Sequence, residues 1–282
     1  MIRVLILCLT CLIFAAPVRS QTPMSRDEAL KQLYRDYDPA TKTAHWICTK
    51  GQQQEQHEGW PCSEEYAKVS VTVELSTQVV EHGTEKTYLV ASAIPSGDSH
   101  DFECHSCAPA IGVAVFAWRE MRWELESARA AVGWFGEWGG AATSQLVAIG
   151  PALHGVILWS GFSGQGYHES VKYLLAPLGS SVDEVWKLYD EQDDSGAFDP
   201  NDKSGQHRLY YAEVAFKFVY VGDGDYYDIL AMSRGTDYKG KANWTKQYRL
   251  RDGQYSLLHT IPYVETKVST KKSEPPQSTR TK

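Results

Sequence analysis

The clearest helical pattern lies near the N-terminus. Ser25 and Glu28 have the spacing of a capping box, in which each side chain satisfies a free N–H group of the first turn. The apolar residues that follow recur at helical spacing until Asp38-Pro39 interrupts them. These residues are Ala29, Leu30, Leu33, Tyr34 and Tyr37. We therefore predict one amphipathic helix that begins after Ser25 and ends before Asp38.

From residue 68 onward, hydrophobic positions alternate with polar ones, which is the period of a strand with one buried face. The face is formed by Val69, Val71, Val73 and Leu75. Residues 88–94 are the expected hairpin partner, and residues 81–84 contain Gly83 and suit a tight turn. Three later groups of short apolar runs follow, at 88–126, 146–188 and 228–258. They predict successive antiparallel meanders, and hence a mainly β fold that is sandwich or propeller-like.

The last of these groups begins with an acidic, glycine-rich turn, Gly222-Asp223-Gly224-Asp225, which leads into the strand at 228–231. With the strands at 248–250 and 255–258, residues 220–260 resemble a degenerate β-meander repeat of the FG-GAP/VCBS type found in propellers. The leading Asp pair of that family's calcium loop is missing here. The resemblance implies β architecture for this segment.

Both ends of the chain have a distinct composition. Arg3 is followed by an apolar run over residues 4–16 and a small-residue cleavage pattern ending at Ser20, which predicts a signal peptide over residues 1–20. The run of 13 apolar residues is shorter than the roughly 20 needed to span a bilayer, so we expect no membrane span. Residues 264–282 are rich in Lys, Ser, Thr and Pro and predict a disordered basic tail. Between them we expect a helix and connector over 21–47 and one β domain over 48–263. A signal peptide implies export, so we expect the protein in a periplasm or secreted to the outside of the cell.

The composition is that of a folded soluble protein, with 43% hydrophobic and 22% charged residues. Of 28 basic residues, Arg3 and Arg19 belong to the leader, so the mature chain has a formal net charge of −9 (26 − 35). This charge argues against general nucleic-acid binding and suits a basic protein partner.

Four cysteines remain after export, namely Cys48, Cys62, Cys104 and Cys107. An oxidising compartment allows three pairings, and parsimony favours Cys48 with Cys62 across a polar loop. A bridge between Cys104 and Cys107 would lock a tight loop ahead of the strand at 111–118, and finding Cys48 joined to either of them would exclude it. Because residues 100–107 hold two thiols, two imidazoles and two carboxylates, a metal- or redox-linked module at Cys104 and Cys107 is a third candidate function.

Two acidic loops have the residue types that coordinate calcium, although ordinary Asp/Gly turns have the same composition. One contains Asp223, Asp225 and Asp228. The other spans residues 190–202, with Glu191, Asp193, Ser195 and Asp202 as its oxygen donors. Apart from calcium at these loops, no cofactor is expected.

A near match to the nucleophile elbow of hydrolases surrounds Ser163, but Gln165 stands where the second glycine belongs. An extracytoplasmic hydrolase that uses Ser163, or a carboxylate with a histidine, is therefore the alternative function. We assign no catalytic residue.

Aromatic residues among glycines form the most suggestive pattern for binding, because such loops present large rings to a partner. They are Trp134, Phe135, Trp138, Trp159, Phe162 and Tyr167. The opposite expectation is that these rings cap the β core. With no catalytic motif of full strength, the sequence favours a non-catalytic exported binding protein, such as an inhibitor or immunity-type protein that neutralises a secreted enzyme or toxin.

Overall fold

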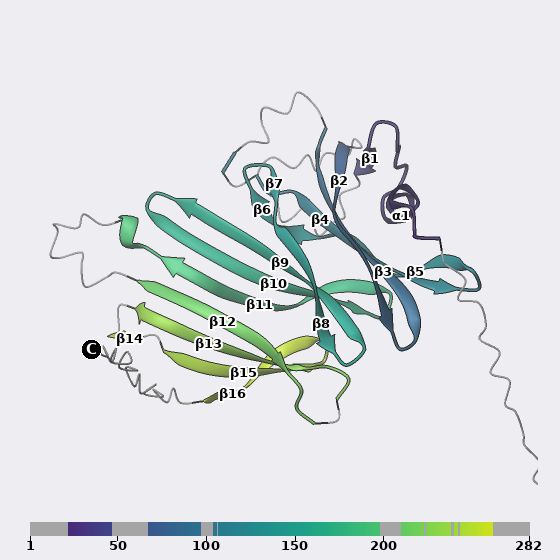
Figure 1. Ribbon diagram of the computed structural model, residues 1–282. Helices are drawn as coiled ribbons and strands as arrows, with labels where there is room; N and C mark the ends of the chain where they lie inside the picture. The colour runs from purple at the N-terminus through teal and green to yellow at the C-terminus, as the bar shows by residue number, and fades with distance from the viewer. Residues whose placement is uncertain are drawn as a thin grey trace, which may run out of the picture.

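The computed structural model describes residues 22–46, 67–96, 104–105, 107–197, 210–222, 224–237, 240–241 and 243–261. Two large antiparallel sheets dominate these ranges (Figure 1). The first sheet follows chain order, with β1 (Thr43–Trp46), β2 (Ala67–Glu81), β3 (Thr84–Pro95), β4 (Ala110–Arg119) and β5 (Arg122–Trp134). A small hairpin of β6 (Gly136–Glu137) and β7 (Gly140–Ala141) leads to the second sheet.

The second sheet follows chain order except at β14, which pairs only with β13, so that β13 and β15 are neighbours; all these pairs are antiparallel. Its strands are β8 (Thr143–Gly150), β9 (Leu153–Gly164), β10 (Tyr167–Leu178), β11 (Ser181–Asp193), β12 (Tyr211–Val219), β13 (Asp228–Asp237), β14 (Gly240–Lys241), β15 (Trp244–Arg251) and β16 (Gln254–Ile261). A 3-10 turn, η2 (Ser195–Ala197), lies after β11. This order confirms the predicted meanders, and the segment at 220–260 forms the last strands of the second sheet.

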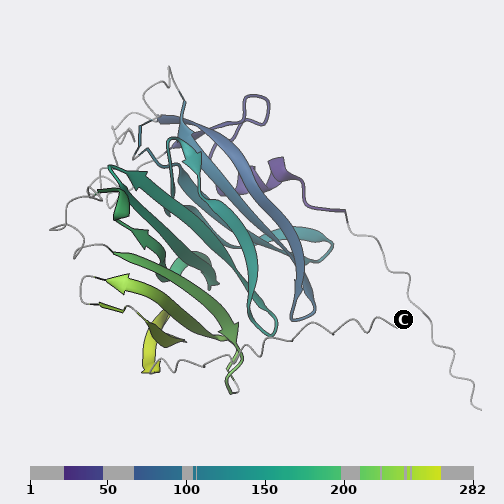
Figure 2. The same ribbon diagram turned by 60° about the vertical axis from the view of Figure 1, so that its left-hand side comes forward.

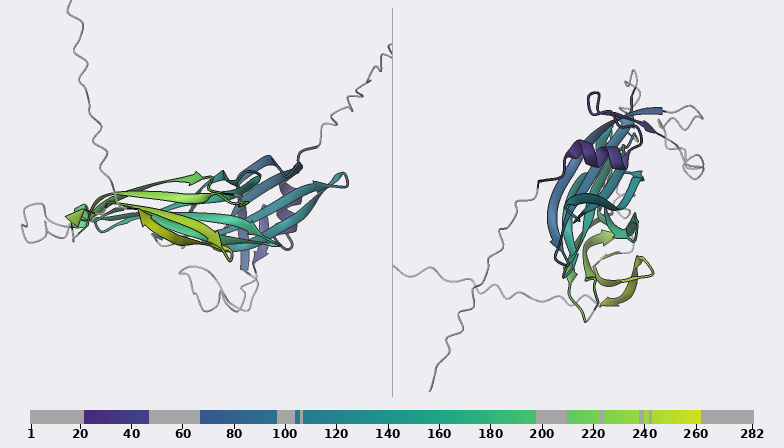
Figure 3. Two further views of the ribbon diagram at one scale, coloured as in Figure 1. Left: turned by 90° about the horizontal axis from the view of Figure 1, so that it is seen from below. Right: turned by 90° about the vertical axis from the view of Figure 1, so that its right-hand side faces the viewer.

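Helix α1 (Arg26–Leu33) covers the outer face of the first sheet, where it lies across the strands in the right-hand view of Figure 3. Leu30 packs there in one buried cluster with Leu89 of β3 and Phe116 of β4. The helix prediction is confirmed, but the helix ends at Leu33 because the next residue has extended backbone. The capping box is wrong, since the Ser25 side chain makes no cap hydrogen bond.

The inner face of the first sheet packs on β8–β11, and the strands of both sheets run in similar directions in Figure 2. This interface buries Val90 and Val113 from the first sheet and Leu158 from the second, each with at most 1% of its surface exposed. Two aligned sheets with an apolar layer between them form a sandwich. Of the two predicted architectures, the sandwich is therefore the one observed.

The second sheet then bends back on itself. β11 and β12 pair only from Glu191↔Glu213 to Asp193↔Tyr211, after which the two strands separate. The C-terminal strands curl at the lower end of the right-hand view in Figure 3, and Gln254 Nε2 of β16 donates to the Glu184 carbonyl of β11 at 2.7 Å. The bend encloses a further buried cluster around Trp186 and Ile229.

A β-bulge in β2 corrects one sequence prediction. Val73 pairs with Ala91 and Leu75 with Val90, so Glu74 is the extra residue. An extra residue reverses the side-chain alternation beyond it. Val69, Val71 and Val73 therefore pack on the helix side of the sheet, whereas Leu75 packs between the sheets.

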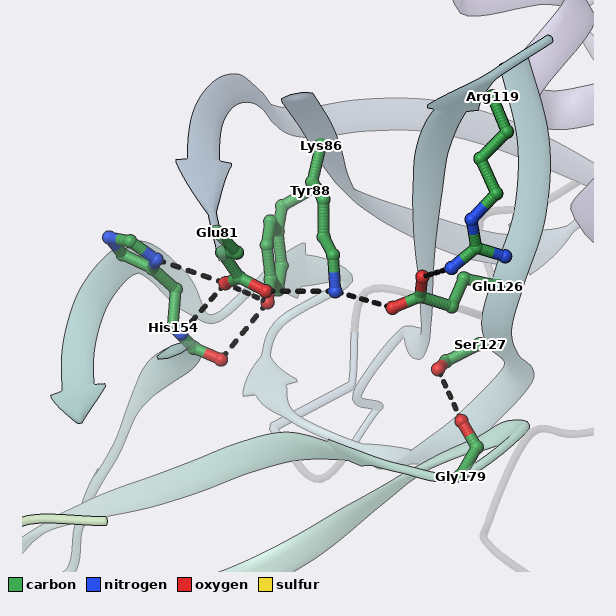
Figure 4. A network of polar contacts seen from close by, with 8 residues as sticks. All are labelled: Glu81, Lys86, Tyr88, Arg119, Glu126, Ser127, His154 and Gly179. Atoms are coloured by element: carbon green, nitrogen blue, oxygen red, sulfur yellow. Dashed lines mark hydrogen bonds and ion pairs between the residues drawn. The ribbon is translucent and has the colours of Figure 1, made fainter. Parts of the chain in front are cut away.

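A buried polar network joins the two sheets (Figure 4). The Glu81 carboxylate, which is fully buried at the end of β2, accepts hydrogen bonds from the Tyr88 hydroxyl at 2.7 Å and the His154 backbone N–H at 2.8 Å. Lys86 Nζ lies 3.0 Å from Glu81 Oε2 and 2.5 Å from Glu126 Oε1, and Arg119 also pairs with Glu126. Burial alone would raise the pKa of the Glu81 carboxyl, but these hydrogen bonds and the Lys86 charge together lower it. Glu81 is therefore an ionised group that links the β2–β3 hairpin to β9.

Among the described residues, no helix is long and apolar enough to cross a membrane. The predicted signal peptide and basic tail lie outside the described ranges, as do Cys48 and Cys62.

Candidate functional site

The β9–β10 hairpin carries the candidate site at its tip. Gln165 and Gly166 form the two-residue turn with positive φ angles of 53° and 83°. A Cβ on Gly166 would lie 2.2 Å from the carbonyl carbon of Gly196 in η2, so a side chain cannot fit there. Position 166 therefore needs glycine for two reasons, its positive φ and the close η2 backbone. The hairpin tip lies in direct contact with that backbone.

An aromatic cluster forms beside this tip from three separate parts of the chain. The His105 ring meets Trp138 edge-on at 4.9 Å between centroids and Phe162 at 4.4 Å. His105 Nε2 also contacts the Ser163 carbonyl, which fixes the imidazole over β9. Trp138 and Phe162 are nevertheless 56% and 46% exposed. We call His105, Trp138, Phe162 and the neighbouring exposed Tyr167 the aromatic edge.

A disulfide holds the loop that presents His105. Cys104 and Cys107 are bonded, with 5.0 Å between their Cα atoms, which confirms the predicted tight loop. Cys107 is buried, and its carbonyl accepts a 2.8 Å hydrogen bond from the Gly139 N–H in the β6–β7 hairpin. The disulfide and this hydrogen bond fix His105 and Trp138 relative to each other. As disulfide partners, the two sulfurs are not thiolate metal ligands.

A pocket of about 580 Å³ opens next to the aromatic edge. Its described lining combines rings with polar and acidic groups, namely Phe162, Tyr167, His168, Glu169, Gln192, Asp193, Asp194 and Tyr210. Gln192 connects two walls, because it donates to Glu169 Oε2 at 3.0 Å and accepts from the Tyr210 hydroxyl at 2.8 Å. The pocket is thus a preformed hollow with an ordered hydrogen-bonded rim.

The charge around the pocket is negative, because Glu169, Asp193 and Asp194 line it. Close by, but outside the lining, Glu191 lies directly opposite Glu213 across the β11–β12 pair. The hydroxyl of Tyr211 donates to Glu213, and this bond, with burial and the charge of Glu213, raises the pKa of Tyr211 to about 12. Of the described residues that line the pocket, none is Lys or Arg.

Ser163 and His168 face each other directly across the hairpin, with Ser163 Oγ 2.6 Å from His168 Nδ1. On the other side of the ring, His168 Nε2 lies 3.6 Å from a Glu191 carboxylate oxygen. Hydroxyl, imidazole and carboxylate therefore follow one another in the order of a nucleophile, a base and an orienting acid, but the 3.6 Å contact is too long for a hydrogen bond. The sequence identified Ser163 but had no signal for its partners.

Three of the six aromatic residues singled out by the sequence gather at this site. They are Trp138, Phe162 and Tyr167. Trp159 is half exposed, but it lies three residues from Phe162 on β9 and so on the opposite face, where its indole donates to Ser170.

The other two aromatic residues, Phe135 and Trp134, do not face outward as one of the two expectations held. Phe135 is only 6% exposed and packs on Tyr173 in the core between the sheets, with 4.6 Å between ring centroids. Trp134 is half-buried against the core beneath α1. Both therefore support the fold, as the opposite expectation for these rings foresaw.

Two of the predicted calcium ligands, Asp228 and Asp193, have other partners. Both carboxylate oxygens of Asp228 accept hydrogen bonds from Arg249, at 2.9 and 2.8 Å, and one also accepts from Gln247, so Asp228 is a structural ion-pair partner. Asp193 accepts the Ser195 N–H at 2.7 Å within a turn. Asp223 and Asp202 lie outside the described residues. Within the described ranges, no group of three or more His, Cys, Asp and Glu side chains has metal-binding geometry.

No protein-family model, curated protein or solved structure matches this chain. The resemblance of residues 220–260 to FG-GAP/VCBS repeats therefore stays a prediction.

Proposed function

We propose that this chain is an exported, non-catalytic binding protein that recognises a protein partner through the aromatic edge. The observation that carries the proposal is the seating of His105 between the exposed rings of Trp138 and Phe162. A disulfide and two tight hairpins hold these groups in place, so little conformational entropy is lost on binding. Rigid, partly exposed aromatic residues beside a hollow are typical of the residues that dominate protein interfaces.

The proposal includes a role as an inhibitor or immunity-type protein that neutralises a secreted enzyme or toxin. The predicted leader would deliver the protein to the compartment where such a target acts. A preformed surface suits tight binding of one partner, because interface backbones in inhibitor complexes move little. The negative charge of the mature chain favours a basic target through complementary fields.

The test is capture of the tagged, full-length protein from its native compartment, with the stoichiometry of co-purified proteins measured by mass spectrometry. We expect one near-equimolar partner, whose affinity falls at least about tenfold on Trp138→Ala, as at an interface hot spot. Leu257→Ala is the matched control, because Leu257 is 52% exposed on β16, away from the aromatic edge. Loss of binding in both variants, or in neither, would reject the aromatic edge as the binding surface.

A second candidate, an extracytoplasmic hydrolase, is favoured by the Ser163–His168–Glu191 arrangement. In such an enzyme Ser163 Oγ would attack an acyl carbon while its proton passes to His168 Nδ1, and the leaving group would take that proton and depart. A water molecule would then attack the Ser163 ester, with His168 taking a proton from the water and returning one to Ser163 Oγ as the acid is released. A fluorophosphonate probe tests this directly, with Ser163→Ala as the control. Labelling of the folded wild type that is lost in the variant would establish an activated serine. Absence of labelling in the wild type would reject the hydrolase, and the binding function would then be the one remaining candidate.

A further inference from the structure

We infer that the pocket beside the aromatic edge binds an arginine side chain of the partner; this inference rests on the proposed binding function. The pocket offers what a guanidinium group requires, namely aromatic faces for stacking and carboxylate oxygens for paired hydrogen bonds. Phe162, Tyr167 and Tyr210 supply the rings, and Glu169, Asp193 and Asp194 supply the carboxylates.

Neutral donors orient the carboxylates of the pocket, and no cation of the described chain neutralises them. Glu169 Oε2 accepts from the Gln192 amide at 3.0 Å, and Asp193 Oδ1 accepts the Ser195 N–H at 2.7 Å. Asp194 Oδ1 accepts the Tyr210 N–H at 2.5 Å. In each case a neutral donor fixes one oxygen, and no Lys or Arg of the described chain forms an ion pair with these three acids. Within the described residues, the second oxygens therefore have no cationic partner and can accept hydrogen bonds from a cation.

The strand register places a further pair of acids close to the pocket. Glu191 and Glu213 are directly opposite each other, and like charges at such positions repel. Neither residue lines the pocket, but Glu191 lies 3.6 Å from the ring of His168, which does. A cation bound beside His168 would therefore also reduce this repulsion.

Arginine fits the pocket better than lysine does. A guanidinium group is planar, stacks on rings and donates two parallel hydrogen bonds to a carboxylate, whereas an ammonium group is a strongly hydrated point charge. The pocket combines rings and acids on adjacent walls, with Tyr167 and Glu169 in alternate positions on β10 and so on one face of the hairpin. A side chain that stacks and pairs at once uses both walls.

The inference is tested by titrating the full mature chain with a blocked tri-arginine peptide. Binding is measured from the NMR chemical-shift changes of the Gly164 and Gly166 amides. A tri-citrulline peptide of the same length has the same shape without the charge. We expect saturable shifts with the arginine peptide only. The double variant Glu169→Gln, Asp194→Asn keeps every neutral hydrogen bond described above and should weaken binding at least about tenfold. Glu120→Gln, at an exposed acid in the β4–β5 turn, is the control and should bind as the wild type does.

A separate measurement on the free protein tests the charge argument. Glu213→Gln removes the repulsion with Glu191 and leaves an acceptor for the Tyr211 hydroxyl. It should raise the melting midpoint by about 1–3 °C.

Equal binding of the citrulline peptide, or undiminished binding by the double variant, would overturn the inference. If the double variant still captures the native partner while Trp138→Ala does not, the binding function stands and the arginine pocket is wrong. If the arginine peptide binds but no partner is captured, the pocket stands and the proposed function fails.

Discussion

Replacing Glu81 with Gln should destabilise the protein more than any other single neutralisation of an acid in the described chain. The carboxylate is fully buried, and the ion pair with Lys86, whose side chain is 12% exposed, is shielded from water. Breaking a buried pair by removing one partner costs about 3–5 kcal/mol. Lys86 keeps Glu126 as a second partner, and the Gln oxygen still accepts hydrogen bonds from Tyr88 and His154. The cost should therefore lie at the lower end of this range of unfolding free energy. We expect a loss of about 3 kcal/mol, which lowers the melting midpoint by about 6–12 °C.

The pH dependence of this loss identifies its cause. The pKa of the Glu81 carboxyl is lowered in the folded protein, from a usual value of 4.5. The ionised carboxylate therefore stabilises the fold above pH 4.5, and this contribution disappears as the pH falls through the lower folded value. Urea unfolding at pH 7 should show the full gap between wild type and Glu81→Gln, and the gap should narrow below pH 4.5.

Glu124→Gln is the matched control for this prediction. Glu124 is paired with Arg122, but the Arg122 side chain is 70% exposed, and an exposed pair contributes at most about 1 kcal/mol. If Glu81→Gln costs no more than Glu124→Gln, or if its cost is the same at pH 3.5 and pH 7, the reasoning about a buried ionic link between the sheets is refuted.

Three further outcomes follow from the packing and the turns. Reducing the Cys104–Cys107 disulfide should increase acrylamide quenching of Trp138 fluorescence, measured as the difference from a Trp138→Phe variant, while the far-UV circular dichroism spectrum stays unchanged. Equal quenching before and after reduction would contradict the role of the disulfide in holding His105 against Trp138. Leu158→Ala should cost about 2–5 kcal/mol in urea unfolding, because Leu158 is fully buried between the sheets, and a loss below 1 kcal/mol would be inconsistent with this packing. Gly166→Ala should destabilise more than Gly179→Ala, since both have positive φ but only the first meets a backbone; equal midpoints would contradict this.

Much of the fold could be predicted from the sequence because its signals are local. The helix, the β2–β3 hairpin and the Cys104–Cys107 bridge each depend on residues close together in the chain, and the structure has all three. The change of face at Leu75 was missed because a bulge arises from pairing with β3, which alternation along one strand does not reveal.

The contacts that build the site could not be predicted in the same way. His105 meets Phe162 across more than fifty residues, and Glu81 reaches His154 across 73. No periodicity encodes such contacts. The sequence did indicate Ser163 and the acids after residue 190, but it assigned them to different sites, and only the register of β10 with its neighbours brings them to one end of the sheet.

Several features that reduce the stability of this chain lie at the proposed binding surface. Trp138 has a φ of 54°, a left-handed conformation that costs a large side chain about 1–2 kcal/mol relative to glycine. Its ring is nevertheless more than half exposed, so burial does not offset this strain. Nearby, Glu191 faces Glu213 without a cation between them in the described chain. Strain, exposed rings and like charges each reduce stability, and all three occur near the pocket, although residues elsewhere, such as Lys42 and Met121, also have positive φ. Such local conflicts are expected where residues serve binding rather than folding. A partner that covers the rings and neutralises the acids would remove all but the backbone strain, so its binding should also stabilise the fold.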